Sequence, residues 1–168
     1  MKKMTKPRIA AFYIDIIIIA ATLCFIFGNS LESIPESQDT SLSVLDAVKP
    51  ILEPIVGPEN VTDHLVRKLA HFIEFAALGI EALGMCIITR RTRIQNLCNC
   101  AFAGLLAAVT DETIQIFSAR GSQVQDVLLD YGGYITGAAV MFIIFTASAA
   151  VKRRRSGSAG EDLNSGHK

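Results

Sequence analysis

Ionisable residues recur at helical spacing inside otherwise apolar stretches of this 168-residue chain. A histidine beside carboxylates could perform general acid–base chemistry, whereas arginine and lysine could bind an anion such as phosphate. The stretch "RKLAHFIEFAALGIEALG" places several such residues on one face of a helix. They are Arg67, His71, Glu74 and Glu81, with Lys68 at the border of that face.

Two further stretches carry polar residues of the same kinds. In "DETIQIFSARGSQVQD", Asp111 stands beside Glu112, and Gln115 follows Glu112 by three positions, so that Glu112 and Gln115 face the same way on a helix. Arg120 follows where that helix is expected to leave the apolar stretch. This stretch therefore adds carboxylates, an amide and a guanidinium to the candidate groups.

The third stretch, "QDVLLDYGGYITG", combines carboxylates with glycines. Asp126, Asp130, Gly133 and Gly137 follow one another at intervals of four, three and four, which is one face of a helix. The glycines allow a neighbouring helix to approach closely. We expect this approach to bring Asp126 and Asp130 toward the carboxylates of the other helices.

The elements that position these residues are membrane spans. A window of about 19 residues, which crosses a hydrocarbon layer of about 30 Å as a helix, finds apolar stretches at about residues 9–27, 65–88, 97–117 and 127–151. The sequence therefore predicts an all-α fold: a polytopic membrane protein whose four-helix transmembrane bundle comprises residues 9–151.

Charge is segregated along the chain, although the formal net charge is zero. Basic clusters occur in the N-terminal segment 1–8, in residues 90–93 and in residues 152–155. Because Lys and Arg remain in the cytoplasm during insertion, both termini are expected there and the polar residues outside. The tail 152–168 is small and polar, and its composition predicts disorder. No strongly basic face points to nucleic acid.

The long loop after the first span is expected on the outer face. Its first part is rich in Ser, Glu and Pro and predicts irregular structure. Apolar residues then recur at helical spacing from Leu42 to Val56, with Pro50 and Pro54 interrupting them. We expect a short, broken amphipathic helix that lies on the bilayer or caps the bundle.

The buried charges predict a polar pocket at the outer end of the bundle. A charge at the centre of a membrane helix costs about 2.5–3.5 kcal/mol on insertion scales, so charges from three spans should face one another or water. The predicted ligand-binding set is Arg67, Lys68, His71, Glu74, Asp111, Glu112, Gln115, Arg120, Asp126 and Asp130.

These motifs together resemble the VanZ-like family. The family pattern joins Arg-Lys-x-x-His-Phe-x-Glu to Asp-Glu-x-x-Gln, a downstream Arg, and an Asp followed by a Gly-x-x-x-Gly. The positions that match are Arg67, Lys68, His71, Phe72, Glu74, Asp111, Glu112, Gln115, Arg120, Asp126, Gly133 and Gly137. The sequence departs from the pattern at Phe75, where the family usually has Tyr, and at Asp130, where it usually has Asn.

The resemblance covers roughly residues 10–151 and implies a bacterial cell-membrane protein. The founding member is associated with resistance to the glycopeptide antibiotic teicoplanin in Gram-positive bacteria, through no established mechanism. The implied partner is a membrane lipid or a lipid-linked cell-wall precursor, whose anionic headgroup Arg67, Lys68 and Arg120 would bind. An oligomer of this chain is left open.

Three other functions stay open at the level of sequence. An enzyme could use His71, Glu112 or Asp126 as catalytic groups, or hold a divalent metal through Asp111, Asp126 and Asp130, although the spacing matches no strong metal-binding pattern. The sequence does not identify a cofactor, and no metal site is assigned. A charge network could serve only helix packing. Ion or proton transport could use Glu74 and Glu81.

Overall fold

Helices account for nearly all of the computed structural model, which describes residues 5–31, 34–118 and 123–165. Within these described residues, four helices are long and apolar enough to cross a membrane, counting α5 from Val124 to Lys152. The predicted all-α membrane bundle is confirmed, and each predicted span agrees with a helix to within about one turn. The helices are α1 (Lys6–Leu31), α2 (Ile34–Val56), α3 (Asp63–Ile88), α4 (Ile94–Phe117) and α5 (Val124–Ser165), with a 3-10 turn, η1 (Pro58–Asn60), before α3.

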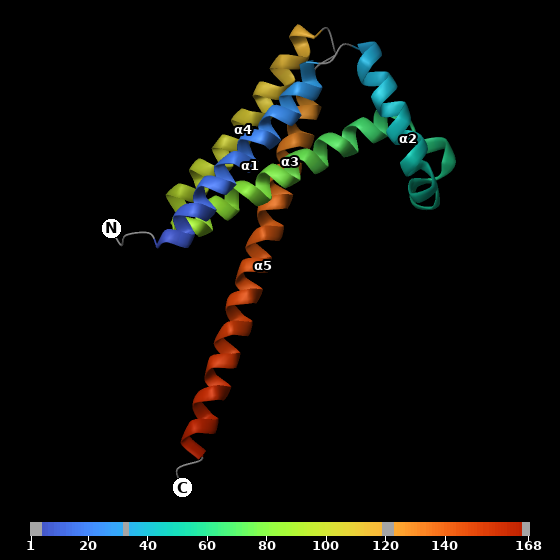
Figure 1. The fold of residues 1–168 in the computed structure, drawn as a ribbon. Helices are drawn as coiled ribbons and strands as arrows, with labels where there is room; N and C mark the ends of the chain where they lie inside the picture. Colours follow the sequence, from blue (N-terminus) through green and yellow to red (C-terminus); the bar gives the residue numbers. More distant parts are fainter. Residues whose placement is uncertain (1–4, 32–33, 119–122, 166–168) are drawn as a thin grey trace.

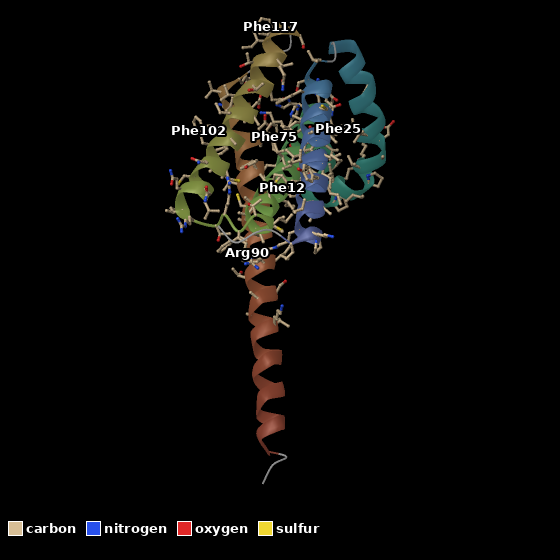
Figure 2. The ribbon with its side chains drawn as sticks, turned by 60° about the vertical axis from the view of Figure 1, so that its left-hand side comes forward. Phe12, Phe25, Phe75, Arg90, Phe102 and Phe117 are labelled. Carbon is tan, nitrogen blue, oxygen red and sulfur yellow. The ribbon has the colours of Figure 1, made fainter. Side chains whose placement is uncertain are left out.

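The central helix of the bundle is α3. Each of α1, α2, α4 and α5 packs against it, and α4 also packs against α1 and α5 (Figure 1). Helices α1 and α4 end, and α5 begins, at one end of the bundle, where Figure 2 labels Phe117. We call this the Phe117 end; Arg90, in the turn between α3 and α4, lies at the other.

Glycines bring α5 into backbone contact with α3. A Cβ atom at Gly133 would collide with the carbonyl oxygen of Phe72, and one at Gly137 with the carbonyl oxygen of Ala76. The predicted role of this Gly-x-x-x-Gly is therefore confirmed. Because Asp130 lies about one turn before Gly133, the same contact sets Asp130 opposite the turn of α3 that carries His71.

The apolar core is small, and large apolar side chains cover the outside of the helices. Phe75 is completely buried among the helices, whereas Phe25, Phe102 and Phe117 are 59%, 60% and 85% exposed (Figure 2). This inverted distribution suits lipid around the bundle better than water. The buried hydrophobic cluster consists of Ile26, Phe75, Leu78, Ala108 and Tyr134.

Local signals fix both ends of α3. The Thr62 side chain accepts a hydrogen bond from the Leu65 backbone N–H at 3.2 Å, which caps the first turn. At the other end Arg90 adopts a left-handed backbone conformation with φ of 56°, which turns the chain toward α4. Because α3 ends just before Arg90, its first turns point toward the Phe117 end (Figure 2), and His71 lies on the third turn.

The loop between α1 and α3 differs from the expectation. Helix α2 is continuous from Ile34 to Val56, so the predicted irregular first part and the predicted break at the prolines are both wrong. Pro50 and Pro54 lie inside the helix, and both are exposed. Because prolines four residues apart share one side, the hydrogen bonds that they remove lie on one exposed side of α2.

Helix α5 does not stop at the end of its apolar part. It continues to Ser165, through the segment for which the composition predicts disorder. In Figure 1 this part extends away from the bundle with no other helix beside it. The segment contains no proline, so nothing in its backbone interrupts the hydrogen bonds of the preceding helix.

Candidate polar site at the Phe117 end of the bundle

A completely buried carboxylate, Asp111 of α4, lies at the centre of the polar site. Its Oδ1 accepts a hydrogen bond from the Ser30 hydroxyl of α1 at 2.6 Å, and its Oδ2 accepts one from the Gln115 amide at 2.9 Å. Ser30 is also completely buried, and Gln115 is 7% exposed. Two neutral donors therefore fix the orientation of this carboxylate without neutralising its charge.

His71 and Asp130 complete a buried cluster with Asp111. The His71 Nδ1 lies 3.6 Å from Asp111 Oδ2 and 3.9 Å from Asp130 Oδ1. One side-chain N or O atom from each of the three residues lies within 4.8 Å of the other two. We call these residues the His71 triad; they come from α3, α4 and α5, so the packing of three helices creates the cluster.

Asp130 is the member of the triad whose carboxylate lacks hydrogen-bond donors among the described residues. Its side chain is 1% exposed, and within residues 5–31, 34–118 and 123–165 neither of its oxygens accepts a hydrogen bond. Transfer of an ionised carboxylate into an apolar interior is costly unless donors or a cation compensate its charge. This part of the site is therefore short of positive charge.

Two ion pairs lie at the rim of the site. Lys68 Nζ lies 2.8 Å from Asp126 Oδ1, and this pair links α3 to α5. Arg67 lies 2.7 Å from Asp63, one turn earlier on the same helix. All four side chains are between 22% and 32% exposed, so these cations remain accessible from outside the bundle.

Two further carboxylates bind donors outside the triad. Glu112 is 4% exposed, and its Oε2 accepts a hydrogen bond from the backbone N–H of Gln123, just before α5, at 3.2 Å. Glu74 accepts a hydrogen bond from the Asn29 amide of α1 at 3.2 Å. These two acids connect α4 to the start of α5 and α3 to the end of α1.

The structure divides the predicted binding set into three groups. His71, Asp111 and Asp130 come together in the triad, and Gln115 donates to it. Asp126 pairs with Lys68 rather than joining Asp111 and Asp130, so the predicted metal-binding trio is incomplete in this arrangement. The rest are Glu74 and Glu112, which bind donors elsewhere, Arg67, which pairs within its own helix, and Arg120, which lies outside the described residues.

Sequence reasoning missed the contribution of α1. Ser30 hydrogen-bonds Asp111, Asn29 hydrogen-bonds Glu74, and Thr22 donates to Glu81 at 2.9 Å. A signal was present, because Thr22, Ile26 and Asn29 are spaced by four and three residues and therefore share one face. That face packs toward the acids of α3 and α4.

Four apolar helices around a buried polar cluster define an integral membrane protein with a polar site enclosed near one end of its bundle. The chain belongs to the VanZ/LLP1 family, whose model matches residues 12–146. That range covers most of α1, all of α2, α3 and α4, and most of the apolar part of α5. No curated protein and no solved structure matches the chain.

Proposed function

We propose that this VanZ-like protein binds the anionic headgroup of a membrane lipid, or of a lipid-linked envelope component, at the Phe117 end of its bundle. The observation that carries the proposal is the pair of partly exposed cations at the rim of the buried polar site, Arg67 and Lys68. Both lie in the first turns of α3, where an approaching headgroup would meet them.

A bound phosphate could take the place of the carboxylates that pair with the rim cations. Partly exposed ion pairs contribute only about 0.2–1 kcal/mol, so a phosphate can replace Asp63 or Asp126 as the partner of a rim cation at little cost. A guanidinium binds phosphate through two parallel hydrogen bonds, and the flexible ammonium of Lys68 adds a point charge. The large exposed apolar side chains of α1, α3 and α4 would hold the acyl chains beside the bundle.

A lipid-binding assay with charge-reversal variants tests the proposal. The full chain in a neutral detergent is titrated with fluorescent phosphatidylglycerol and, separately, with the zwitterionic phosphatidylcholine. We expect preference for phosphatidylglycerol, and a loss of about tenfold or more in affinity for Lys68→Glu and Arg67→Glu, which corresponds to about 1.4 kcal/mol.

The matched control is Arg91→Glu, which makes the same change of charge in the turn at the opposite end of the bundle, where Arg91 is exposed. This variant should bind phosphatidylglycerol like the wild type. Equal binding of the two lipids, or an equal loss of affinity in Arg91→Glu, would contradict a headgroup site at the rim.

The proposal includes the orientation that places the Phe117 end outside the cell. It rests on the basic segments near the N-terminus, in the turn at Arg90 and at residues 152–155 of α5, because segments rich in Lys and Arg are retained in the cytoplasm during insertion. In a variant without native cysteines, Gln123→Cys should react with an impermeant maleimide in intact cells, whereas Arg91→Cys should react only after lysis. The reverse pattern would place the site inside.

The family also suggests an effect on susceptibility to teicoplanin-type antibiotics, which we propose for this chain as a consequence of headgroup binding. Cells that express the wild type should tolerate more teicoplanin than cells that express Lys68→Glu at the same membrane abundance. Equal inhibitory concentrations for the two would separate the chain from this phenotype.

One observation favours a second function, that of a membrane enzyme. His71 Nδ1 lies 3.6 Å from Asp111 Oδ2, and hydrogen bonds from Ser30 and Gln115 hold that carboxylate. A histidine beside a fixed carboxylate is a common arrangement for general acid–base catalysis. Turnover of a lipid-linked substrate that His71→Gln abolishes would favour the enzyme over a binding protein.

A further inference from the structure

We propose that the His71 triad binds a divalent transition-metal ion of the Zn²⁺ type, through one nitrogen of His71 and one oxygen each of Asp111 and Asp130. The inference does not depend on lipid binding, because the triad comprises residues of α3, α4 and α5 and includes neither rim cation. The ligand proposed for the triad is a cation, whereas the headgroup proposed for the rim is an anion.

The spacing of the donor atoms suits one small ion. The three atoms lie within 4.8 Å of one another, and His71 Nδ1 lies 3.6 Å from Asp111 Oδ2 and 3.9 Å from Asp130 Oδ1. A tetrahedral Zn²⁺ at about 2.0–2.1 Å from each ligand separates its ligand atoms by about 3.4 Å. The two distances from His71 Nδ1 exceed that spacing by about 0.2 and 0.5 Å, and the separation of the two carboxylate oxygens exceeds it by at most about 1.4 Å, so rotation of the side chains would complete three bonds.

Asp130 provides the second, independent observation. Its carboxylate is 1% exposed, points into the triad and accepts no hydrogen bond from the described residues. Buried polar groups in native proteins almost always have partners, so a buried carboxylate without donors indicates a missing cation. A metal ion bound by Asp130 Oδ1 would supply the absent interaction.

The charges of the triad balance a divalent ion. Asp111 and Asp130 together carry two negative charges when ionised, which equals the charge of the ion, and neutral His71 adds none. A complex without net charge is the arrangement that a low-dielectric interior tolerates best. Without the ion, two ionised carboxylates beside one histidine would repel each other across the site.

The surroundings of Asp111 resemble the outer shell of a metal site. Protein metal ligands that are carboxylates usually accept hydrogen bonds that fix their orientation. Ser30 donates to Asp111 Oδ1 and Gln115 donates to Oδ2, so these bonds hold the ligand in place while lone pairs remain for the ion.

The donor set selects the class of ion. Ca²⁺ and Mg²⁺ prefer oxygen ligands alone, whereas an imidazole nitrogen with carboxylate oxygens suits Zn²⁺ and similar transition-metal ions. Three protein ligands leave one position of a tetrahedral ion for water or for an oxygen of another molecule. A phosphate oxygen of a bound headgroup could occupy that position.

The test measures Zn²⁺ binding by the full chain in a neutral detergent that contains no anionic lipid. Protein stripped with a chelator is dialysed against micromolar Zn²⁺, and bound metal is counted by mass spectrometry, with the melting temperature measured in parallel. We expect about one Zn²⁺ per wild-type chain and a higher melting temperature with the ion. Asp130→Asn and Asp111→Asn should lower the affinity roughly 100-fold or more.

Asp46→Asn is the matched control, because it makes the same substitution at an exposed position of α2, outside the triad and the rim ion pairs. It should bind Zn²⁺ like the wild type. Asp130→Asn keeps the shape of the side chain and should fold without metal, and its melting temperature should no longer respond to Zn²⁺.

Three results would overturn the metal site: no stoichiometric Zn²⁺ in the wild type, equal retention by Asp130→Asn, or an equal loss in Asp46→Asn. The Zn²⁺ assay contains no anionic lipid. A negative result would therefore say nothing against phosphatidylglycerol binding at the rim, which the lipid titration tests separately. Conversely, a chain that holds Zn²⁺ but shows no preference for phosphatidylglycerol would retain the metal site and lose the proposed headgroup site.

Discussion

Ser30 of α1 donates a 2.6 Å hydrogen bond to Asp111 of α4, and both side chains are completely buried. This bond connects the first span to the polar site, which the other spans form among themselves. Since Asp111 also lies 3.6 Å from His71, the position of α1 and the geometry of the His71 triad depend on each other.

Ser30→Ala should therefore destabilise the bundle. The substitution removes the donor and leaves Asp111 Oδ1 without it, and hydrogen bonds to charged groups contribute about 1.5–3 kcal/mol in soluble proteins. Hydrogen bonds between membrane helices are weaker, with a maximum of about 1.7 kcal/mol in double-mutant cycles, so we expect a loss of about 1–2 kcal/mol. Reversible unfolding in mixed micelles with sodium dodecyl sulfate measures it.

The control for this variant is Ser148→Ala, the same substitution at an exposed position of α5. It should change the free energy of unfolding by less than about 0.5 kcal/mol. If Ser30→Ala were as stable as Ser148→Ala, the hydrogen bond to Asp111 would have no role in holding α1.

Two glycines of α5 should respond in opposite ways to alanine. A Cβ at Gly137 would collide with the Ala76 carbonyl oxygen, whereas a Cβ at Gly132 meets nothing within 4 Å. Gly137→Ala should force α3 and α5 apart and cost about 1–3 kcal/mol of stability. Gly132→Ala should be neutral or stabilise the helix by up to about 1 kcal/mol. Melting temperatures of the two variants in one detergent compare them directly, and a stable Gly137→Ala would refute the close approach.

The ion pair between Lys68 and Asp126 should be weakly coupled. Their side chains are 32% and 22% exposed, so solvent screens much of the attraction across the 2.8 Å separation. A double-mutant cycle with Lys68→Ala and Asp126→Ala should give a coupling energy of about 0.2–1 kcal/mol that falls as salt is added. A coupling above about 2 kcal/mol, independent of salt, would mean that this pair is part of the buried network instead.

The sequence predicted the spans and the helix faces well, because both depend on short-range patterns. Hydropathy located α1, α3, α4 and the apolar part of α5, and the glycine spacing predicted the close contact of α5 with a neighbour. Helical periodicity also set His71 on the face of α3 that carries Glu74. Each of these predictions was made from the hydropathy or the residue spacing within a single helix.

The partners of individual side chains could not be predicted in this way. Asp111 and Glu112 are adjacent in the sequence and both are buried, yet Asp111 binds Ser30 of α1 and Glu112 binds the backbone N–H of Gln123. Which group lies opposite depends on how neighbouring helices are rotated and offset. The continuous α2 was missed for a different reason, since prolines on one exposed side bend a helix without ending it.

Tyr134 provides a test of the packing between α4 and α5 below the polar site. Its side chain is 2% exposed, and its hydroxyl donates a hydrogen bond to the Cys100 carbonyl oxygen of α4 at 2.8 Å. Tyr134→Phe keeps the ring and removes the donor, so it should lower the free energy of unfolding by about 0.5–1.5 kcal/mol. Unfolding in mixed micelles again measures the change.

The neighbouring Tyr131 offers a matched control for the same substitution. Its ring stacks on that of Tyr134 with centroids 6.4 Å apart, and it is only half-buried. In the described part of the chain its hydroxyl forms no hydrogen bond, so Tyr131→Phe should cost less than about 0.5 kcal/mol. If both variants lost the same stability, ring packing rather than the bond to Cys100 would hold α5 against α4. If only Tyr134→Phe lost stability, the hydroxyl would be identified as the group that links the two helices.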